Sequence, residues 1–305
     1  MNVVGEDVVP SRALGFAQLW HVHAGYRISG DVVSADGSIV RAYGPAAHPE
    51  LPAAVAKLPR GDVAAVQRLV TTFGLLGYGG LIGDQRCGDP LLWVWSHAET
   101  LHLCLDLIYA SQQLDVSQVR QRLLGLRLPV AHEPMREAET DRLPYCPGAY
   151  VAIREGVVPQ VWGSDATRAA LLLALDADLS EARQTLRRLE RDDALVMQLA
   201  RQIVTSVVNG NIAGIARRVP SGTAGAPGWL FGFSALIELA YWHLADVLDT
   251  RQVQRCAGCG AYFLQTHGRQ RFCPDFRAKT RTSPCANRQR MRRYLSRHRG
   301  MSNDN

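Results

Sequence analysis

The chain has 305 residues, of which 47% are hydrophobic, so it can bury a conventional core and general disorder is excluded. Its charge is uneven. Residues 251–305 contain 13 Lys or Arg against 2 Asp or Glu, a net charge of +11, whereas residues 1–250 contain 21 against 26, a net charge of −5; together they make the chain's +6. A surface for an acidic partner is therefore expected in the C-terminal part.

The sequence favours a soluble, cytoplasmic protein without a membrane partner. Its first ten residues include Glu6 and Asp7 and lack the basic start and apolar run of a secretory signal. Two apolar stretches resemble membrane spans, but 69–83 is only 15 residues long and 229–248 is interrupted by charged residues. Seven cysteines, an odd number, do not suit a secreted disulfide framework.

Hydrophobic periodicity predicts a mainly helical body with a few β-strands, an α+β class. Strands are expected at 19–28 and 37–44, separated by a turn-rich 30–37, and in a hairpin around 155–156. Helices are expected at 62–77, 93–113, 116–126, within 164–218, and at 229–248 after a loop at 220–228. The helix expected at 229–248 is apolar around most of its circumference, which predicts a central place in the core.

The composition divides the chain into a body, residues 1–250, and a small basic module, residues 251–305, with a boundary near 249–254. No motif in the body identifies its type. We expect it to act as a sensor or an oligomerisation domain, and self-association is accordingly one partner hypothesis.

Four of the seven cysteines lie within 30 residues of one another: Cys256, Cys259, Cys273 and Cys285. Zinc favours four thiolates in a tetrahedron, and a Cys-x2-Cys pair can reach one ion from a tight turn, for which Gly258 and Gly260 are suited. Four thiolates leave no open coordination position, so the spacing predicts one structural Zn²⁺ ion and no catalytic metal. His267 is an alternative to one of the cysteines.

Residues around the cysteines predict a treble-clef-like zinc finger. The stretch 261–272 reads as a hairpin that turns at His267 and Gly268 and returns the chain to Cys273. Ser283 is expected to cap the final helix, with Pro284 at its first position and Cys285 in its first turn. The positive end of the helix dipole would favour a thiolate there.

This module resembles the CGNR zinc fingers of bacteria. Those fingers have a Cys-x2-Cys pair, a third cysteine, and then Cys-Gly-Asn-Arg opening a basic helix. Here Cys285, Ala286, Asn287 and Arg288 stand in that place, and RCAGCGAYFL and RQRFC resemble the knuckle and hairpin. The similarity covers about 45 residues, with Ala in place of Gly and a long insert, PDFRAKTRTSP. The resemblance implies a DNA-binding transcription regulator.

The final helix, expected at 285–299, has two kinds of surface. Met291, Tyr294 and Leu295 fall on one side and are expected to pack on the zinc hairpin through Phe263 or Phe272. Arginines cover the rest and suit phosphate oxygens: Arg288, Arg290, Arg292, Arg293, Arg297 and Arg299. We therefore expect nucleic-acid contacts here, with Arg288 also suited to buttress the metal. Two alternatives are a module that docks a protein or its own acidic body, and a solvated tail.

We expect no enzyme, although the body leaves this open. His97 and Glu99 match the H-x-E half of a zinc deaminase, but the only Cys-x2-Cys lies over 150 residues later and has two better partners. His21 and His23 share one face of a strand with no carboxylate at a suitable spacing. The glycine-rich segment 74–83 lacks the Lys-Ser/Thr of a phosphate loop.

Overall fold

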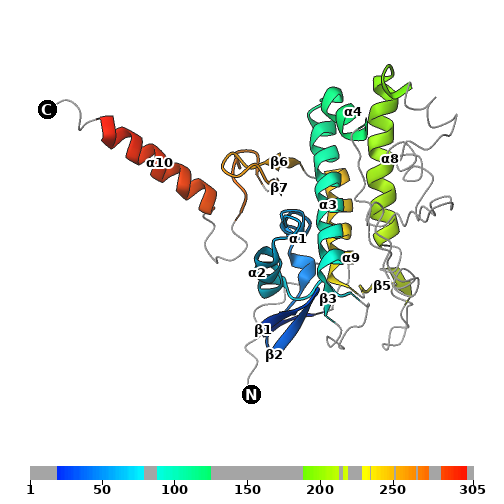
Figure 1. Cartoon of the computed structure of the whole chain (residues 1–305). Helices are drawn as coiled ribbons and strands as arrows, with labels where there is room; N and C mark the ends of the chain where they lie inside the picture. The colour runs from blue at the N-terminus through cyan, green and yellow to red at the C-terminus, as the bar shows by residue number, and fades with distance from the viewer. Residues whose placement is uncertain are drawn as a thin grey trace.

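The structure is a computed structural model that describes residues 19–78, 88–124, 188–212, 216–218, 229–233, 235–250, 252–265, 267–274 and 283–300. Over these ranges the protein is mostly helical with small antiparallel sheets, which confirms the predicted class (Figure 1). In the same ranges, no helix has the length and apolar character needed to cross a bilayer. The strands expected around 155–156 and the loop expected at 220–228 lie outside the described residues.

The N-terminal sheet has three antiparallel strands, β1 (Trp20–Ser29), β2 (Val32–Tyr43) and β3 (Asp89–Pro90). The long turn expected at 30–37 is wrong. Only Gly30, with a φ of 57°, and Asp31 turn the chain, and β2 begins immediately afterwards. Val33 is fully buried, so its packing and its pairing with β1 outweigh the turn-rich composition of the segment.

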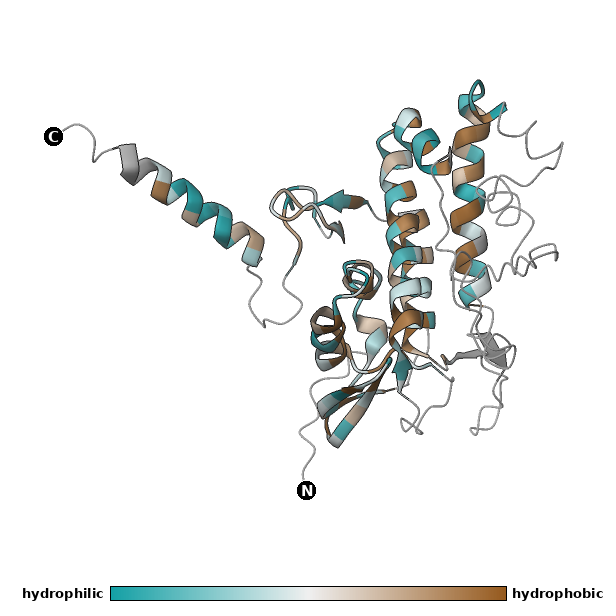
Figure 2. Cartoon of the chain, viewed as in Figure 1, coloured by the Kyte–Doolittle hydropathy of each residue, from teal (hydrophilic) through white to brown (hydrophobic). Residues whose placement is uncertain are grey.

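The body's core is built from helices. A 3₁₀ turn, η1 (Pro45–Ala47), leads into α1 (Leu51–Val55) and α2 (Val63–Phe73), and these are followed by α3 (Leu91–Gln112), α4 (Val116–Leu124), α8 (Asp193–Ile212) and α9 (Leu236–Thr250). Helices α3, α8 and α9 pack against one another, and α1 packs on α3 and α9 (Figure 1). Hydrophobic residues recur along α3 and α8 in Figure 2.

Aspartates begin three of these helices. Asp62 accepts a hydrogen bond from the Ala65 amide at 2.8 Å at the start of α2, and Asp115 does the same for Gln118 at 2.9 Å at α4. Asp192 caps α8 at 2.9 Å, where the chain leaves the helical path after Leu189 and restarts. The helical pattern expected across 164–218 is therefore interrupted, because a capping aspartate starts a new helix.

The helix expected at 229–248 is shorter than its apolar pattern. Its first residues form β5 (Trp229–Phe231), which pairs with β4 (Ala216–Arg218), and α9 starts at Leu236. Pairing with β4 gives the backbone N–H and C=O groups of this segment the hydrogen bonds that a longer helix would have given them. A short apolar run in the sequence does not distinguish a strand from a helix. The predicted central place of this helix is confirmed, since Leu239, Tyr241 and Leu244 are fully buried.

A third hairpin joins the body to the C-terminal module. Strands β6 (Val253–Arg255) and β7 (Tyr262–Leu264) pair antiparallel, and their Val253, Tyr262 and Leu264 are buried in the same hydrophobic cluster as α3 and α9. By contrast, α10 (Pro284–Gly300) projects away from the rest of the molecule (Figure 1). Figure 2 shows that α10 is largely hydrophilic.

Candidate metal centre

Four cysteine sulfurs lie together at the C-terminal module, from Cys256, Cys259, Cys273 and Cys285, and all are within 4.8 Å of one another. The Cys273 Sγ lies 3.8 Å from both the Cys259 and the Cys285 Sγ. A tetrahedron with metal–sulfur bonds of about 2.3 Å has sulfur–sulfur edges of about 3.8 Å. The four thiols are therefore positioned to hold one metal ion. Across the described residues, no other group of three or more His, Cys, Asp or Glu is so placed.

The first two sulfurs come from a tight knuckle between β6 and β7. The Cys256 amide donates to the Ala261 carbonyl at 2.9 Å, and the Gly260 amide donates to the Cys256 carbonyl at 2.8 Å. Gly260 has a φ of 73°, which only glycine adopts at low cost. Gly258 is needed for space and not for its backbone conformation. A Cβ there would lie 2.8 Å from the Cys285 Cβ, so glycine permits the close approach of α10.

The segment that leads to Cys273 does not form the hairpin expected at 261–272. The turn at His267 forms, with the Gln270 amide donating to the His267 carbonyl at 3.0 Å. The strand before it, β7, pairs with β6 and not with the returning chain. The returning chain is held to the knuckle by the Ala257 amide, which donates to the Arg271 carbonyl at 2.9 Å. His267, the alternative ligand, is exposed and outside the cysteine cluster.

The fourth sulfur lies in the first turn of α10, as predicted. Pro284 is the first helical residue. The Ser283 hydroxyl accepts a hydrogen bond from the Ala286 amide at 3.4 Å, and its carbonyl accepts one from the Asn287 amide at 3.0 Å. The helix thus begins at the metal centre, and the orientation of Cys285 is set by the helix start.

Burial and nearby donors shape the chemistry of the thiols. Cys256, Cys273 and Cys285 are buried around the fully buried Phe263, whereas Cys259 is exposed. Burial raises the pKa of the Cys256 thiol, but hydrogen bonds from the backbone at Cys273, Gly258 and Cys259 outweigh it and bring the pKa to about 6. Burial raises the pKa of Cys273, an effect partly offset by the charge of Lys57.

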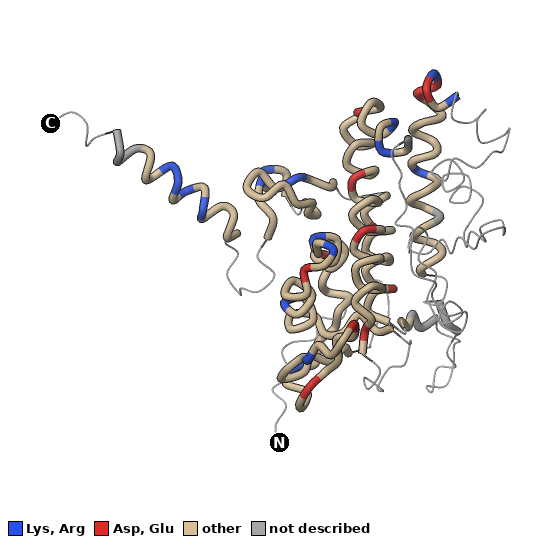
Figure 3. Tube along the Cα trace, viewed as in Figure 1, with Lys and Arg blue, Asp and Glu red and all other residues tan. Residues whose placement is uncertain are grey.

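The predicted nucleic-acid residues are distributed along α10. Arg288 Nη2 donates to the Cys285 Sγ at 3.2 Å, which is the buttressing role considered for it. Arg290, Arg292 and Arg293 are exposed. Figure 3 shows basic positions along this helix. Arg297 and Arg299 belong to the same helix, but their side chains lie outside the described residues.

The packing expected for the apolar side of this helix is wrong. Met291, Tyr294 and Leu295 are 59%, 59% and 48% exposed. Because α10 projects outward, its middle turns do not reach the knuckle, and Phe263 is already enclosed by the cysteines.

A buried polar cluster joins the module to the body. The sequence does not predict it, because its only sign there is an aspartate inside an apolar helix. Asp106 of α3 is 2% exposed and accepts hydrogen bonds from the Tyr262 hydroxyl of β7 and from Gln118, the latter at 3.1 Å. Arg122 completes it with an ion pair to the same carboxylate. Nearby, the Gln112 side chain accepts a hydrogen bond from the Val253 amide at 2.9 Å. We refer to Asp106, Gln118, Arg122 and Tyr262 as the Asp106 cluster.

The histidines considered for other chemistry lie apart from the cysteines. His97 is fully buried, with Nδ1 3.0 Å from the Tyr241 hydroxyl, and burial lowers its pKa to about 3, so it is neutral. Glu99 pairs with Arg60 at 3.3 Å. His97 therefore lines a helix face in the core.

No protein-family model, curated protein or solved structure matches the chain. The resemblance to CGNR zinc fingers therefore rests on the module's own cysteines and helix.

Proposed function

We propose that the protein holds one structural zinc ion in its four-cysteine site and acts as a DNA-binding transcription regulator. The observation that carries the proposal is the geometry of the cysteine cluster, whose 3.8 Å sulfur–sulfur separations match the edges of a tetrathiolate tetrahedron. Zinc suits this site because it prefers soft thiolates in that geometry and has no redox chemistry to oxidise them. With four protein ligands, the ion would have a structural role.

The DNA-binding part of the proposal follows from what the site supports. Helix α10 has Cys285 in its first turn and carries the exposed Arg290, Arg292 and Arg293. Figure 3 shows basic positions along this helix, which projects away from the body. Guanidinium groups bind phosphate oxygens through paired N–H groups, and most of the affinity for DNA comes from such contacts. A metal that positions the first turn of α10 also positions these arginines, so DNA binding should require zinc.

Metal binding is tested by native mass spectrometry and metal analysis of the purified protein. We expect one zinc equivalent per chain, and its loss in Cys259→Ser, because a hydroxyl is a poor ligand for zinc at neutral pH. Cys104→Ala is the matched control, since Cys104 is buried in the core of the body, outside the cluster. A full zinc equivalent in Cys259→Ser would refute the ligand assignment.

DNA binding is tested by measuring the affinity of the intact protein for duplex DNA across a salt series. If four to six arginines contact phosphates, log K should fall against log salt with a slope of about −4 to −5. Arg292→Ala/Arg293→Ala should weaken binding to every sequence and flatten the slope by up to ~2.

The control for that experiment is Arg27→Ala/Arg201→Ala, which removes the same charge from exposed positions on β1 and α8. Equal slopes for the two double variants would contradict the assignment of phosphate contacts to α10.

A second candidate function is a zinc-dependent protein-interaction module. The exposed Met291, Tyr294 and Leu295 on α10 favour it, because apolar side chains gathered on one side of a projecting helix suit a groove on a partner. Absence of DNA binding by the intact, zinc-loaded protein at low salt would favour this function over the first.

A further inference from the structure

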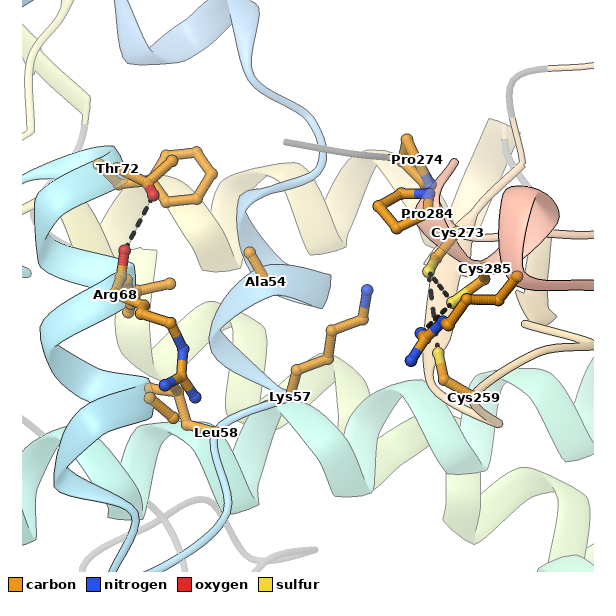
Figure 4. A pocket seen from close by; sticks show the side chains of 14 residues that line it. Ala54, Lys57, Leu58, Arg68, Thr72, Cys259, Cys273, Pro274, Pro284 and Cys285 are labelled. Carbon is orange, nitrogen blue, oxygen red and sulfur yellow. Dashed lines mark hydrogen bonds between the residues drawn. The ribbon is translucent and has the colours of Figure 1, made fainter. Parts of the chain in front are cut away.

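A lysine of the body is directed toward the metal ligands across a cavity of about 340 Å³. This residue, Lys57, comes directly after Ala56, the residue that ends α1. Figure 4 shows its side chain directed toward the labelled cysteine sulfurs, whereas Arg68 lies on the opposite wall of the cavity and is directed away from them. The body therefore places one positive charge toward the four-cysteine site.

The metal centre itself has excess negative charge. A divalent ion held by four thiolates leaves two negative charges on the site. Three of the four cysteines are buried, so water solvates this charge only in part. Charge removed from water is unfavourable unless an opposite charge compensates it. The site is therefore expected to be more stable with cations beside it.

Arg288 supplies one such cation from within the C-terminal module. Its Nη2 donates a hydrogen bond to the Cys285 Sγ at 3.2 Å. Both residues belong to the first turns of α10, so this contact forms without any contribution from the body. One of the two excess negative charges remains after Arg288 is counted.

Lys57 is placed to compensate the remaining charge. It is half-buried, so its interaction with nearby charges is screened less than that of a surface lysine. Burial raises the pKa of the Cys273 thiol, and the charge of Lys57 opposes this effect. None of the described residues that line the cavity is acidic, so the negative charge that faces it is that of the cysteines.

We propose that Lys57 stabilises the zinc-loaded form of the site by compensating, together with Arg288, the excess negative charge of the four thiolates. The inference rests on the metal-binding part of the proposed function and goes beyond it, because it gives a residue of the body a share in zinc affinity. Zinc binding would then favour the approach of the knuckle to α1. Residues that surround metal ligands typically change metal affinity by about 10–100-fold.

The test measures zinc affinity in Lys57→Met and Lys57→Arg by competition with a chromophoric chelator. Methionine keeps the unbranched apolar stem and removes the charge, so affinity should fall by roughly 10-fold. Arginine keeps the charge and should restore most of the affinity. Arg68→Met is the matched control, because it removes the same charge from the opposite wall of the same cavity, and it should leave zinc affinity unchanged.

A salt series separates the effect of charge from an effect of packing. Salt screens a charge interaction, so the ratio of the affinities of the intact protein and Lys57→Met should decrease as salt is added. A ratio that does not change with salt, or an equal loss in Lys57→Met and Lys57→Arg, would assign Lys57 a packing role and overturn the inference. A loss in Arg68→Met as large as that in Lys57→Met would overturn it as well.

The outcomes also distinguish this inference from the proposed function. If the intact protein and Lys57→Met each bind one zinc equivalent with equal affinity, the inference is overturned and the metal site stands. If the intact protein binds no zinc, the proposed function fails, and the inference fails with it.

Discussion

At the scale of single residues, Gly258 shows that a glycine in a metal knuckle can be needed for space and not only for a turn. A Cβ at this position would lie 2.8 Å from the Cys285 Cβ, whereas carbon atoms in contact are about 3.5–4.0 Å apart. The sequence suggests a turn glycine, and Gly260 fits that description. Gly258 instead lets the first turn of α10 reach the knuckle.

Gly258→Ala should therefore displace Cys285 and weaken metal binding. Overpacking of this kind costs about 1–3 kcal/mol, which corresponds to roughly 5- to 150-fold in affinity. Competition with a chromophoric chelator measures the change. Gly268→Ala is the control, because a Cβ at Gly268 would meet nothing within 4 Å. Equal affinities for the two variants would show that the first turn of α10 can shift without cost.

At the scale of elements, the β6–β7 hairpin is attached to the body by the buried Asp106 cluster. Burial and the adjacent Asp106 raise the pKa of Tyr262, so its hydroxyl stays protonated and donates to the carboxylate. Arg255 lies over the rings of Tyr262 and Tyr109, at 5.1 and 5.9 Å from their centroids. One face of the hairpin thus fits α3, while its turn carries two of the four metal ligands, Cys256 and Cys259.

Tyr262→Phe should reduce the free energy of unfolding by about 1–3 kcal/mol, because it removes a donor from a buried carboxylate. Urea denaturation measures this. Tyr109→Phe removes the same atom from a neighbouring ring, 5.8 Å away, whose hydroxyl has no hydrogen-bond partner within the described ranges. A loss of equal size in both variants would contradict the role of the Asp106 cluster.

At the scale of the whole molecule, the hairpin that carries two of the metal ligands shares a core with the body, whereas the buried cysteines form a separate cluster around Phe263. Val253, Tyr262 and Leu264 of the hairpin are 0%, 2% and 5% exposed within the main hydrophobic cluster. The division near residue 250, inferred from charge, remains a prediction about sequence organisation. Packing of this kind predicts that metal binding stabilises the body as well as the module.

Removal of zinc by a strong chelator should therefore lower the melting temperature of the body. For a chain of this size, each kcal/mol of lost stability lowers the melting temperature by about 2–4 °C. All six tryptophans precede residue 251, so tryptophan fluorescence follows the body alone. An unchanged fluorescence transition after chelation would contradict the coupling and support two independently folding parts.

Local features of the chain were predictable from the sequence. The spacing of the cysteines determined which thiols meet, since a knuckle and a helix start bring distant ligands together with few alternatives. Ser283 and Pro284 marked the start of α10, and the apolar periodicity of 93–113 predicted α3. These signals act over a few residues, through hydrogen bonds and helical spacing that the residues themselves specify.

Only the tertiary structure decided which elements meet. The pairing of β7 with β6, the strand at Trp229–Phe231 and the exposure of Met291 all depend on neighbours distant in sequence. The approach of Lys57 to the metal centre has the same origin, because this residue lies about 200 residues before the cysteines. The neighbours of a charged residue in the sequence do not determine which cavity its side chain lines. The packing of helices around a shared core determines it.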